Sequence, residues 1–345
     1  MKHNLILLVL MGFILTACSD WNEVKSIELK QANIAEQNSE LYAKYLEDLK
    51  AYKKSAHKQT YVWFNNSQKQ PAGQSQHLTT LPDSVDVVSL MHPKSLADWE
   101  LAEIETIRKD KGTKVIFTLD FDAIKLIFDA RVKEMAEQNK DKKDAPKLDF
   151  IEFLVDTVES SLSLIRKYNY DGISMAYKGK SILHMTESEK RIHIMYENAF
   201  IGIAKDWQDR NKDKMICFEG YPQNLLNKSI LNSCTHIIIP CVDIKNVSGL
   251  DYSMAMASVG GVPTDRFIIA VSTTSTDVKD TKTGYWINNI RSLWGTANWI
   301  TASTTPSIAG IGIYNVNNDY FNSLRISYLY TRNAINILNP SPKTK

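Results

Sequence analysis

The chain has 345 residues, of which 43% are hydrophobic and 23% are charged. This length and composition suit a single globular domain with one large core. The 41 basic and 39 acidic side chains leave a formal net charge of +2. This near balance excludes the strong net positive charge that is typical of nucleic-acid-binding proteins.

The first 18 residues have the pattern of an exported lipoprotein. Lys2 and His3 form a short polar start, and the apolar run over 4–13 is too short to span a bilayer, which takes about 20 residues. The run ends in Leu-Thr-Ala-Cys, with small residues before Cys18. This ending resembles a bacterial lipobox, in which Cys18 is lipidated and becomes the first residue of the mature chain. The alternative is an ordinary secretory signal with an unrelated cysteine.

Residues 19–57 are predicted to form a tether and a polar helix. The helix is indicated by a narrow apolar stripe at helical spacing, made by Leu41, Tyr45, Leu49 and Tyr52. The chain therefore divides into a lipoprotein signal over 1–18, this tether and helix, and one large domain over 58–345.

After residue 57, short β-branched runs alternate with amphipathic segments. The runs predict eight strands, over 61–65, 85–91, 114–119, 172–177, 215–218, 236–240, 267–271 and 311–314. Helical spacing predicts helices over 95–110, over 150–165, from Thr186 onward, over 285–299 and over 321–338. Glu189, three residues after Thr186, has capping-box spacing. Strands that alternate with helices indicate a parallel sheet, and eight of them favour a closed (β/α)8 TIM barrel, an α/β fold.

The sequence predicts no metal site and no cofactor. Apart from Cys18 there are three cysteines; Cys234 and Cys241 flank one predicted strand and stand too far apart to bridge. No Cys/His spacing is typical of zinc, and no glycine-rich nucleotide loop follows the first strand. Four tryptophans fall in helical patterns and are predicted to pack helices against the barrel: Trp99, Trp286, Trp294 and Trp299.

In a barrel of this kind the site lies at the C-terminal ends of the strands. Residues 170–178, at the fourth strand, read Tyr-Asp-Gly-Ile-Ser-Met-Ala-Tyr-Lys. This run is similar to the fourth-strand signature D-G-x-D-x-D-x-E of family 18 glycoside hydrolases. The barrel entry over 45–64 and the eighth strand over 310–320 also resemble this family, in particular Bacteroidetes lipoproteins with a chitinase-like or endo-β-N-acetylglucosaminidase-like barrel. The likeness follows the strand order of nearly the whole chain.

The resemblance implies that the hydrolytic chemistry has been lost. Side chains alternate along a strand, so positions 174, 176 and 178 share one face. In the family, the last of these is the glutamic acid that protonates the glycosidic oxygen, and the one before it is an aspartate that orients the substrate's nucleophilic acetamido group. Here they are Ser174, Ala176 and Lys178, and Asp171 stands only at the structural start of the motif. We therefore expect no catalytic residue in this motif.

The predicted strand ends carry groups that suit a sugar. Aromatic rings can face the C–H side of a pyranose while polar groups take its hydroxyls. The candidate ligand-binding residues are Trp63, Asn65, Asp120, Glu219, Tyr221, Asp243, Tyr314 and Asn315. The resemblance implies that Tyr314 forms the floor of the sugar site. It also implies a tyrosine after the sixth strand, for which residues 240–243 offer no counterpart.

Three hypotheses follow. The first is a non-catalytic, lipid-anchored protein on the outer-membrane surface, which captures N-acetylglucosamine-containing oligosaccharides (N-glycan or chitin type) for a glycan-uptake complex. The second is a hydrolase of the endo-β-N-acetylglucosaminidase type with residual activity or a relocated acid/base pair. That pair would be drawn from the carboxylates near the mouth: Asp120, Asp122, Glu219 and Asp243. The third is a structural subunit of an outer-membrane complex whose cleft is filled by side chains.

Overall fold

A computed structural model of the chain describes residues 37–140, 148–303, 307–322 and 324–341. The predicted signal, with Cys18, and the first part of the tether lie outside these residues. The chain divides into two units, Met1–Tyr45 and Leu46–Lys345. The described part of the first unit, residues 37–45, includes the start of helix α3 (Ser39–Lys54). Among the helices that the described ranges contain, none has the length and apolar character needed to cross a membrane.

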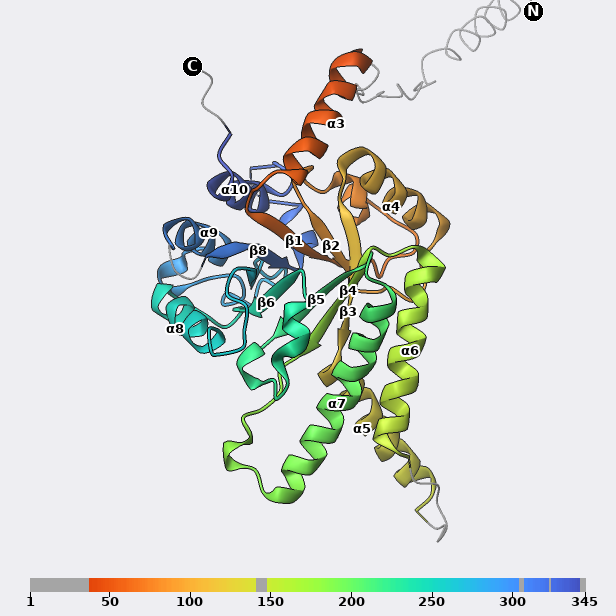
Figure 1. Cartoon of the computed structure of the whole chain (residues 1–345). Coiled ribbons are helices and arrows are strands. Elements are labelled where there is room, and N and C mark those ends of the chain that lie inside the picture. Colours follow the sequence, from red (N-terminus) through yellow and green to blue (C-terminus); the bar gives the residue numbers. More distant parts are fainter. Residues whose placement is uncertain (1–36, 141–147, 304–306, 323, 342–345) are drawn as a thin grey trace, which may run out of the picture. The chain divides into compact units, whose positions relative to one another are not determined.

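Eight parallel strands close into a barrel in sequence order, which confirms the predicted fold (Figure 1). The strands are β1 (Gln59–Phe64), β2 (Val87–Leu90), β3 (Lys114–Asp120), β4 (Gly172–Tyr177), β5 (Met215–Gly220), β6 (His236–Pro240), β7 (Phe267–Ser272) and β8 (Ile308–Tyr314). Strand β1 pairs with both β2 and β8 and so closes the barrel.

The helices that follow the strands are unevenly distributed. They are α4 (Asp98–Lys111), α5 (Phe121–Gln138), α6 (Phe150–Tyr168), α7 (Glu187–Arg210), α8 (Val247–Ala257), α9 (Ser292–Ala302) and α10 (Leu329–Leu338). Two of them, α5 and α6, follow β3, whereas the fully described segments after β1 and β5 contain only short 3-10 turns. Helices α5, α6 and α7 lie side by side and extend beyond the barrel (Figure 1).

The capping box predicted at Thr186 is confirmed. The Thr186 hydroxyl accepts a hydrogen bond from the Glu189 backbone N–H at 3.3 Å, and the Glu189 carboxylate accepts one from the Thr186 backbone N–H at 2.8 Å. These two bonds satisfy amide groups that the first helical turn leaves without partners. The start of α7 is therefore determined by its own sequence.

The helix predicted over 285–299 begins later than its spacing indicated, at Ser292. Tyr285 instead pairs with Arg291 in an isolated bridge, and Asn288 and Asn289 adopt left-handed backbone conformations with φ of 62° and 59°. Asparagine tolerates this conformation better than most residues, so this pair ends the helical pattern locally. The last helix likewise begins at Leu329 and not at 321.

The predicted packing of the tryptophans is only partly correct. Trp286 and Trp299 are buried, with 7% and 8% of their surface exposed. Trp294 is 54% exposed on α9, so its predicted packing against the barrel is wrong. It lies five residues before Trp299, and this spacing turns the two rings to different sides of the helix.

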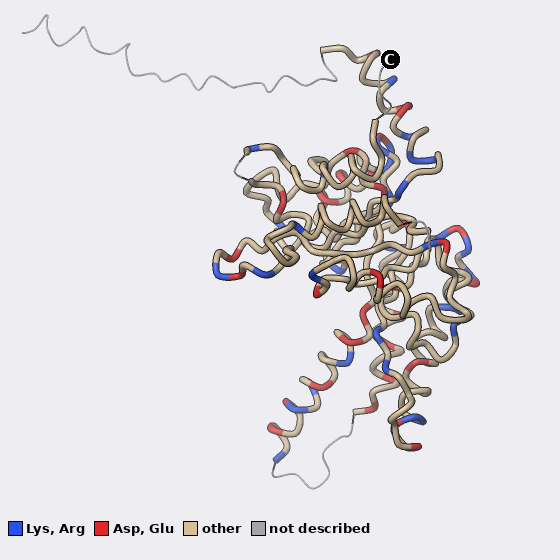
Figure 2. Tube along the Cα trace, turned by 90° about the vertical axis from the view of Figure 1, so that its left-hand side faces the viewer, with Lys and Arg blue, Asp and Glu red and all other residues tan. Residues whose placement is uncertain are grey.

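The core has two layers, one inside the barrel and one between the strands and the helices. The inner layer includes Tyr61, Trp63, Val87, Ile116, Met215, Cys217, Ile238, Ile268 and Ala270. The three cysteines of the described ranges are free and buried. Basic and acidic residues are interspersed along the described part of the trace (Figure 2).

Candidate binding site at the C-terminal mouth of the barrel

A cavity of about 610 Å³ lies at the C-terminal ends of the strands. Six of the eight predicted ligand-binding residues line it: Trp63, Asp120, Glu219, Asp243, Tyr314 and Asn315. They come from strands or strand ends around most of the barrel, because parallel strands bring all their carboxyl ends to one rim. Its volume is typical of pockets that hold small ligands.

Glu219 is the central polar group of this cavity. Its carboxylate projects from β5 and is only 8% exposed. It accepts hydrogen bonds from the hydroxyls of Tyr314 at 2.6 Å, Ser174 at 3.1 Å and Thr118 at 3.3 Å. Burial raises the pKa of Glu219 to about 6, and these hydroxyls partly oppose that rise because they stabilise the anion. The carboxyl group therefore changes its charge close to neutral pH.

Two aromatic rings lie beside this carboxylate. The ring centroids of Trp63 and Tyr314 are 4.3 Å apart, with an angle of 43° between the ring planes. The Trp63 indole N–H donates to the Thr118 hydroxyl at 3.3 Å. Gly312 makes room for the indole, since a Cβ at this position would come within 3.0 Å of the ring. The pair forms a fixed apolar floor, of which Trp63 itself exposes only 6%.

The four motif positions of β4 have different surroundings. Asp171 precedes the strand, where its carboxylate accepts from the Arg108 guanidinium at 3.0 Å and from the Val115 backbone N–H at 2.8 Å. It therefore ties helix α4 and strand β3 to the start of β4, at the end of the barrel away from the cavity. Ser174 is fully buried and donates to Glu219, and Ala176 lines the cavity without a polar group.

Lys178 lies one residue beyond the end of β4 and also lines the cavity. Its side chain is 63% exposed, and its ammonium group is 3.7 Å from the carboxylate of Asp122. An exposed pair at this distance contributes little free energy. The lysine is therefore a solvated group at the rim of the cavity.

The other predicted carboxylates lie around the rim. Asp120 ends β3 and caps helix α5, because its side chain accepts from the Ala123 backbone N–H at 3.0 Å. Asp122 and Asp243 also line the cavity, and Asp243 is exposed. Asp120 lies close enough to Glu219 for its charge to add to the rise in the pKa of Glu219. A buried carboxyl group and several rim carboxylates thus share one cavity.

Two predicted residues are not brought into the cavity. Asn65 follows β1, but its side-chain oxygen accepts from the Ser67 backbone N–H at 3.0 Å and so shapes its own loop. Tyr221 follows β5 and is 37% exposed outside the cavity lining. Asn315, by contrast, lines the cavity in a left-handed conformation with φ of 55° and donates to the Ser272 hydroxyl at 3.2 Å.

Sequence reasoning missed some of the polar groups that line or support this cavity. The hydroxyls of Thr118 and Ser174 were not predicted to bind Glu219, although the strand period alone places Thr118 on the same inner face as Ile116. Lys282 and Thr283 come from the loop between β7 and α9, and Lys245 comes from the loop after β6. No periodic signal in a loop indicates where its side chains point.

The comparisons with known proteins agree with this architecture. Among solved structures, a Glu-to-Gln variant of BT1044 in selenomethionine form aligns with a TM-score of 0.61 at 20% identity, covering 91% of this chain and 98% of that one. An endo-β-N-acetylglucosaminidase from Cordyceps militaris aligns with a TM-score of 0.55 at 14% identity, covering 86% and 95%. These identities establish the fold alone. No curated protein sequence matches.

A sequence model of one family spans most of the chain. It is described as glycoside hydrolase family 18, BT1044-like, and it matches residues 22–337. This range includes the whole barrel, the β4 motif and the residues around Glu219. The chain therefore belongs to glycoside hydrolase family 18, in its BT1044-like group.

Proposed function

We propose that this protein binds oligosaccharides containing N-acetylglucosamine at the C-terminal mouth without hydrolysing them. The observation that carries the proposal is the inner face of β4, where Ser174 and Ala176 provide no carboxylate. In family 18 the chemistry needs an acid at the position that Lys178 occupies, and a carboxylate at the position of Ala176 that orients the acetamido group. The aromatic floor and the polar rim, which suit sugar recognition, are nevertheless present.

The sugar class rests on the family and on one structural relative. A double mutant of the Cordyceps militaris endo-β-N-acetylglucosaminidase, with an Asp-to-Asn and a Glu-to-Gln change, forms a complex with fucosyl-N-acetylglucosamine-Asn. That structure aligns with this chain at a TM-score of 0.56 and 14% identity. We extend this class of ligand to the present cavity as part of the proposal.

We also propose a location and a partner. The lipobox-like ending at Cys18 supports a lipid anchor, and the acidic residues Asp20 and Glu23 just after it support display at the outer-membrane surface. A lipid-anchored binding protein would hold its glycan beside an outer-membrane uptake complex. Palmitate labelling of cells expressing the wild-type chain or Cys18→Ala tests the anchor, and label retained by the Cys18→Ala variant would contradict it.

Binding can be tested by isothermal titration of the purified chain with N-glycan cores and chitooligosaccharides, after a glycan-array screen. Tyr314→Ala removes the more accessible ring of the floor and should weaken binding about tenfold, since a ring contact contributes roughly 1 kcal/mol beyond the area it buries. Trp294→Ala is a matched control, because Trp294 is exposed on α9 outside the cavity. Absence of binding to every glycan, or an equal loss in both variants, would contradict the proposal.

One observation favours a second function, residual hydrolysis. Glu219 is buried in the cavity with its pKa raised to about 6, which is the character of a general acid. Chitooligosaccharides and high-mannose N-glycopeptides should be incubated with the chain, and the products analysed by mass spectrometry. Product formed by the wild-type chain and absent with Glu219→Gln would support hydrolysis. No product from the wild-type chain would exclude it for these substrates.

A further inference from the structure

A second cavity, of about 720 Å³, lies at the opposite mouth of the barrel, where the strands begin. It belongs entirely to the unit Leu46–Lys345 and shares no lining residue with the cavity around Glu219. Its ionisable and imidazole side chains are Lys53, His57, Lys58, Lys114 and His236, with Asp86 as the single carboxylate. The lining therefore has an excess of basic groups.

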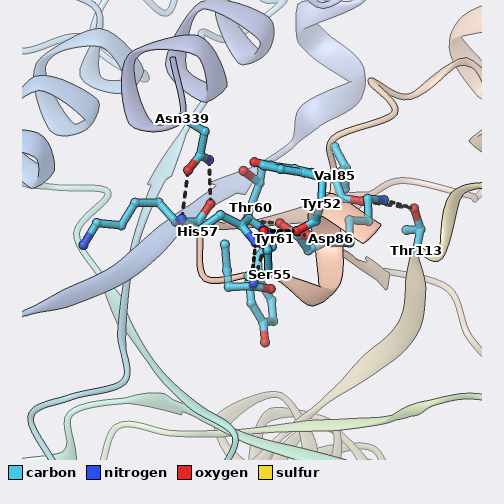
Figure 3. A network of polar contacts seen from close by, with 12 residues as sticks. Tyr52, Ser55, His57, Thr60, Tyr61, Val85, Asp86, Thr113 and Asn339 are labelled. Atoms are coloured by element: carbon cyan, nitrogen blue, oxygen red, sulfur yellow. Dashed lines mark hydrogen bonds and ion pairs between the residues drawn. The ribbon is translucent and has the colours of Figure 1, made fainter. Parts of the chain in front are cut away.

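The carboxylate of Asp86 is already occupied. One oxygen is 3.0 Å from the Nε2 atom of His57, and the other accepts from the Thr60 backbone N–H at 2.7 Å (Figure 3). The hydrogen bond to Asp86 raises the pKa of His57 above its usual value, so this pair tends toward an internal ion pair. Asp86 is therefore hydrogen-bonded to His57 and Thr60, and its single negative charge only partly offsets the lysines: it raises the pKa of Lys53 against the larger effect of burial.

Two of the lysines are held in place by hydrogen bonds to oxygen atoms of the protein. The Lys53 ammonium donates to the Val85 carbonyl and to the Thr113 hydroxyl, and the Lys58 ammonium donates to the Ile308 carbonyl. An ammonium group has three N–H donors, so each keeps at least one that these contacts leave unused. Burial also lowers the pKa of Lys53 to about 8, which reflects the cost of holding this cation away from water.

Lys114 differs from these two. It begins β3 with an exposed side chain, and no residue of the described ranges forms a hydrogen bond or ion pair with its ammonium group. Its charge nevertheless acts on the lining, because it contributes to the lowered pKa of His236. The lining therefore holds one cation without a protein partner in the described residues, together with two lysines that are hydrogen-bonded to the protein.

His236 adds a neutral donor. Its Nδ1 atom lies 2.7 Å from the Tyr61 hydroxyl, which is buried inside the barrel. Burial, with the charges of Lys114 and Arg266, lowers the pKa of His236 to about 4, so the ring is neutral at physiological pH. When the Tyr61 hydroxyl donates to Nδ1, the ring proton resides on Nε2, which has no protein partner within the described residues.

We propose that this N-terminal mouth is an anion site that takes a phosphate group. Lys114 and the His236 ring line the cavity from the starts of β3 and β6, Lys53 and Lys58 add positive charge to the same lining, and a tetrahedral oxyanion offers acceptors in several directions. A carboxylate presents two oxygens in one plane and would use fewer of these donors. The phosphate could belong to a soluble phosphate ester or to a lipid headgroup, and the test distinguishes the two.

The first measurement is isothermal titration of the full chain in detergent with inorganic phosphate at pH 7. The wild-type chain should bind one phosphate saturably, and Lys114→Ala should bind at least about tenfold more weakly, as expected for loss of a charge-assisted hydrogen bond. Lys114→Arg should retain most of the affinity. Lys109→Ala, which removes an equal charge from the outer face of α4, should bind like the wild-type chain.

The second measurement is co-sedimentation with phosphatidylcholine vesicles that contain or lack phosphatidylglycerol, using Lys114→Glu and Lys109→Glu. Binding to the anionic vesicles that only Lys114→Glu weakens, without saturable binding of inorganic phosphate, would identify a lipid headgroup. Saturable binding of inorganic phosphate that depends on Lys114, without such vesicle binding, would identify a soluble ester. Binding of neither probe, or equal losses at positions 114 and 109, would overturn the proposal.

Discussion

Replacing Glu219 with glutamine should change how the stability of the fold depends on pH. Burial raises the pKa of Glu219 from 4.5 to about 6 in the folded chain. The folded state then holds this proton more tightly than the unfolded state does. The contribution of Glu219 to the free energy of unfolding is therefore fully present below pH 4.5 and is lost as the pH rises through about 6. At about 1.4 kcal/mol per pKa unit, the loss is about 2 kcal/mol.

Glutamine keeps the shape of the side chain but does not titrate. Between pH 4.5 and pH 7, the wild-type chain should therefore lose about 2 kcal/mol relative to Glu219→Gln, or about 4 °C in Tm for a domain of this size. Thermal unfolding followed by circular dichroism at a series of pH values measures this change. Glu159→Gln, at an exposed position of α6, is the matched control and should follow the wild-type profile throughout.

The test is whether the Tm difference between the wild-type chain and Glu219→Gln changes with pH. A difference that is the same at every pH reflects only the packing of the new amide. A Tm difference that stays the same from pH 4.5 to pH 7 would refute the argument that burial dominates at Glu219. A change in the opposite direction would show that the three hydroxyl donors outweigh burial and hold the carboxylate ionised.

Three further outcomes are expected. Tyr314→Phe removes the 2.6 Å hydrogen bond to Glu219, so it should lower the free energy of unfolding at pH 7 by about 1–3 kcal/mol in urea titrations and raise the pKa of Glu219 further. Gly312→Ala would place a Cβ 3.0 Å from the Trp63 ring and should cost about 1–3 kcal/mol, measured in the same way. His57→Gln should destabilise the fold more at pH 6 than at pH 9. The raised pKa of His57 gives stability that is complete below pH 6.5 and is lost as the pH rises through the folded value, and Tm at the two pH values checks this.

Much of the fold follows from the sequence because each strand is marked by its own β-branched run. The run Phe267–Val271, for example, falls inside β7 and differs from it by one residue. The main errors lie where a tertiary contact overrides local spacing. The ring of Trp286 packs so close to Gly295 that a Cβ there would come within 2.5 Å of it, and this contact fixes a loop where helical spacing predicted the start of a helix.

The candidate site was predictable as a set of residue types but not as an arrangement. Position at a strand end was enough to place Trp63, Glu219 and Tyr314 around one cavity. Whether Glu219 would accept from Ser174 and Thr118 depends on the register of three neighbouring strands, which the sequence does not state. The basic cavity at the other mouth was also missed, because Lys114 and His236 lie far along the chain from Lys53 and Lys58.

The register of β4 against β5 has a consequence for any carboxylate introduced at position 176. Ala176 is the direct neighbour of Glu219 across the two strands, and both face the cavity. An aspartate restored at position 176 would stand about 5 Å along the sheet from a buried carboxyl group, and two such groups do not ionise together readily. In a chain with Ala176→Asp and Lys178→Glu, the new aspartate would thus not ionise readily while Glu219 is ionised. A carboxylate at position 176 therefore needs a matching change at its cross-strand neighbour Glu219.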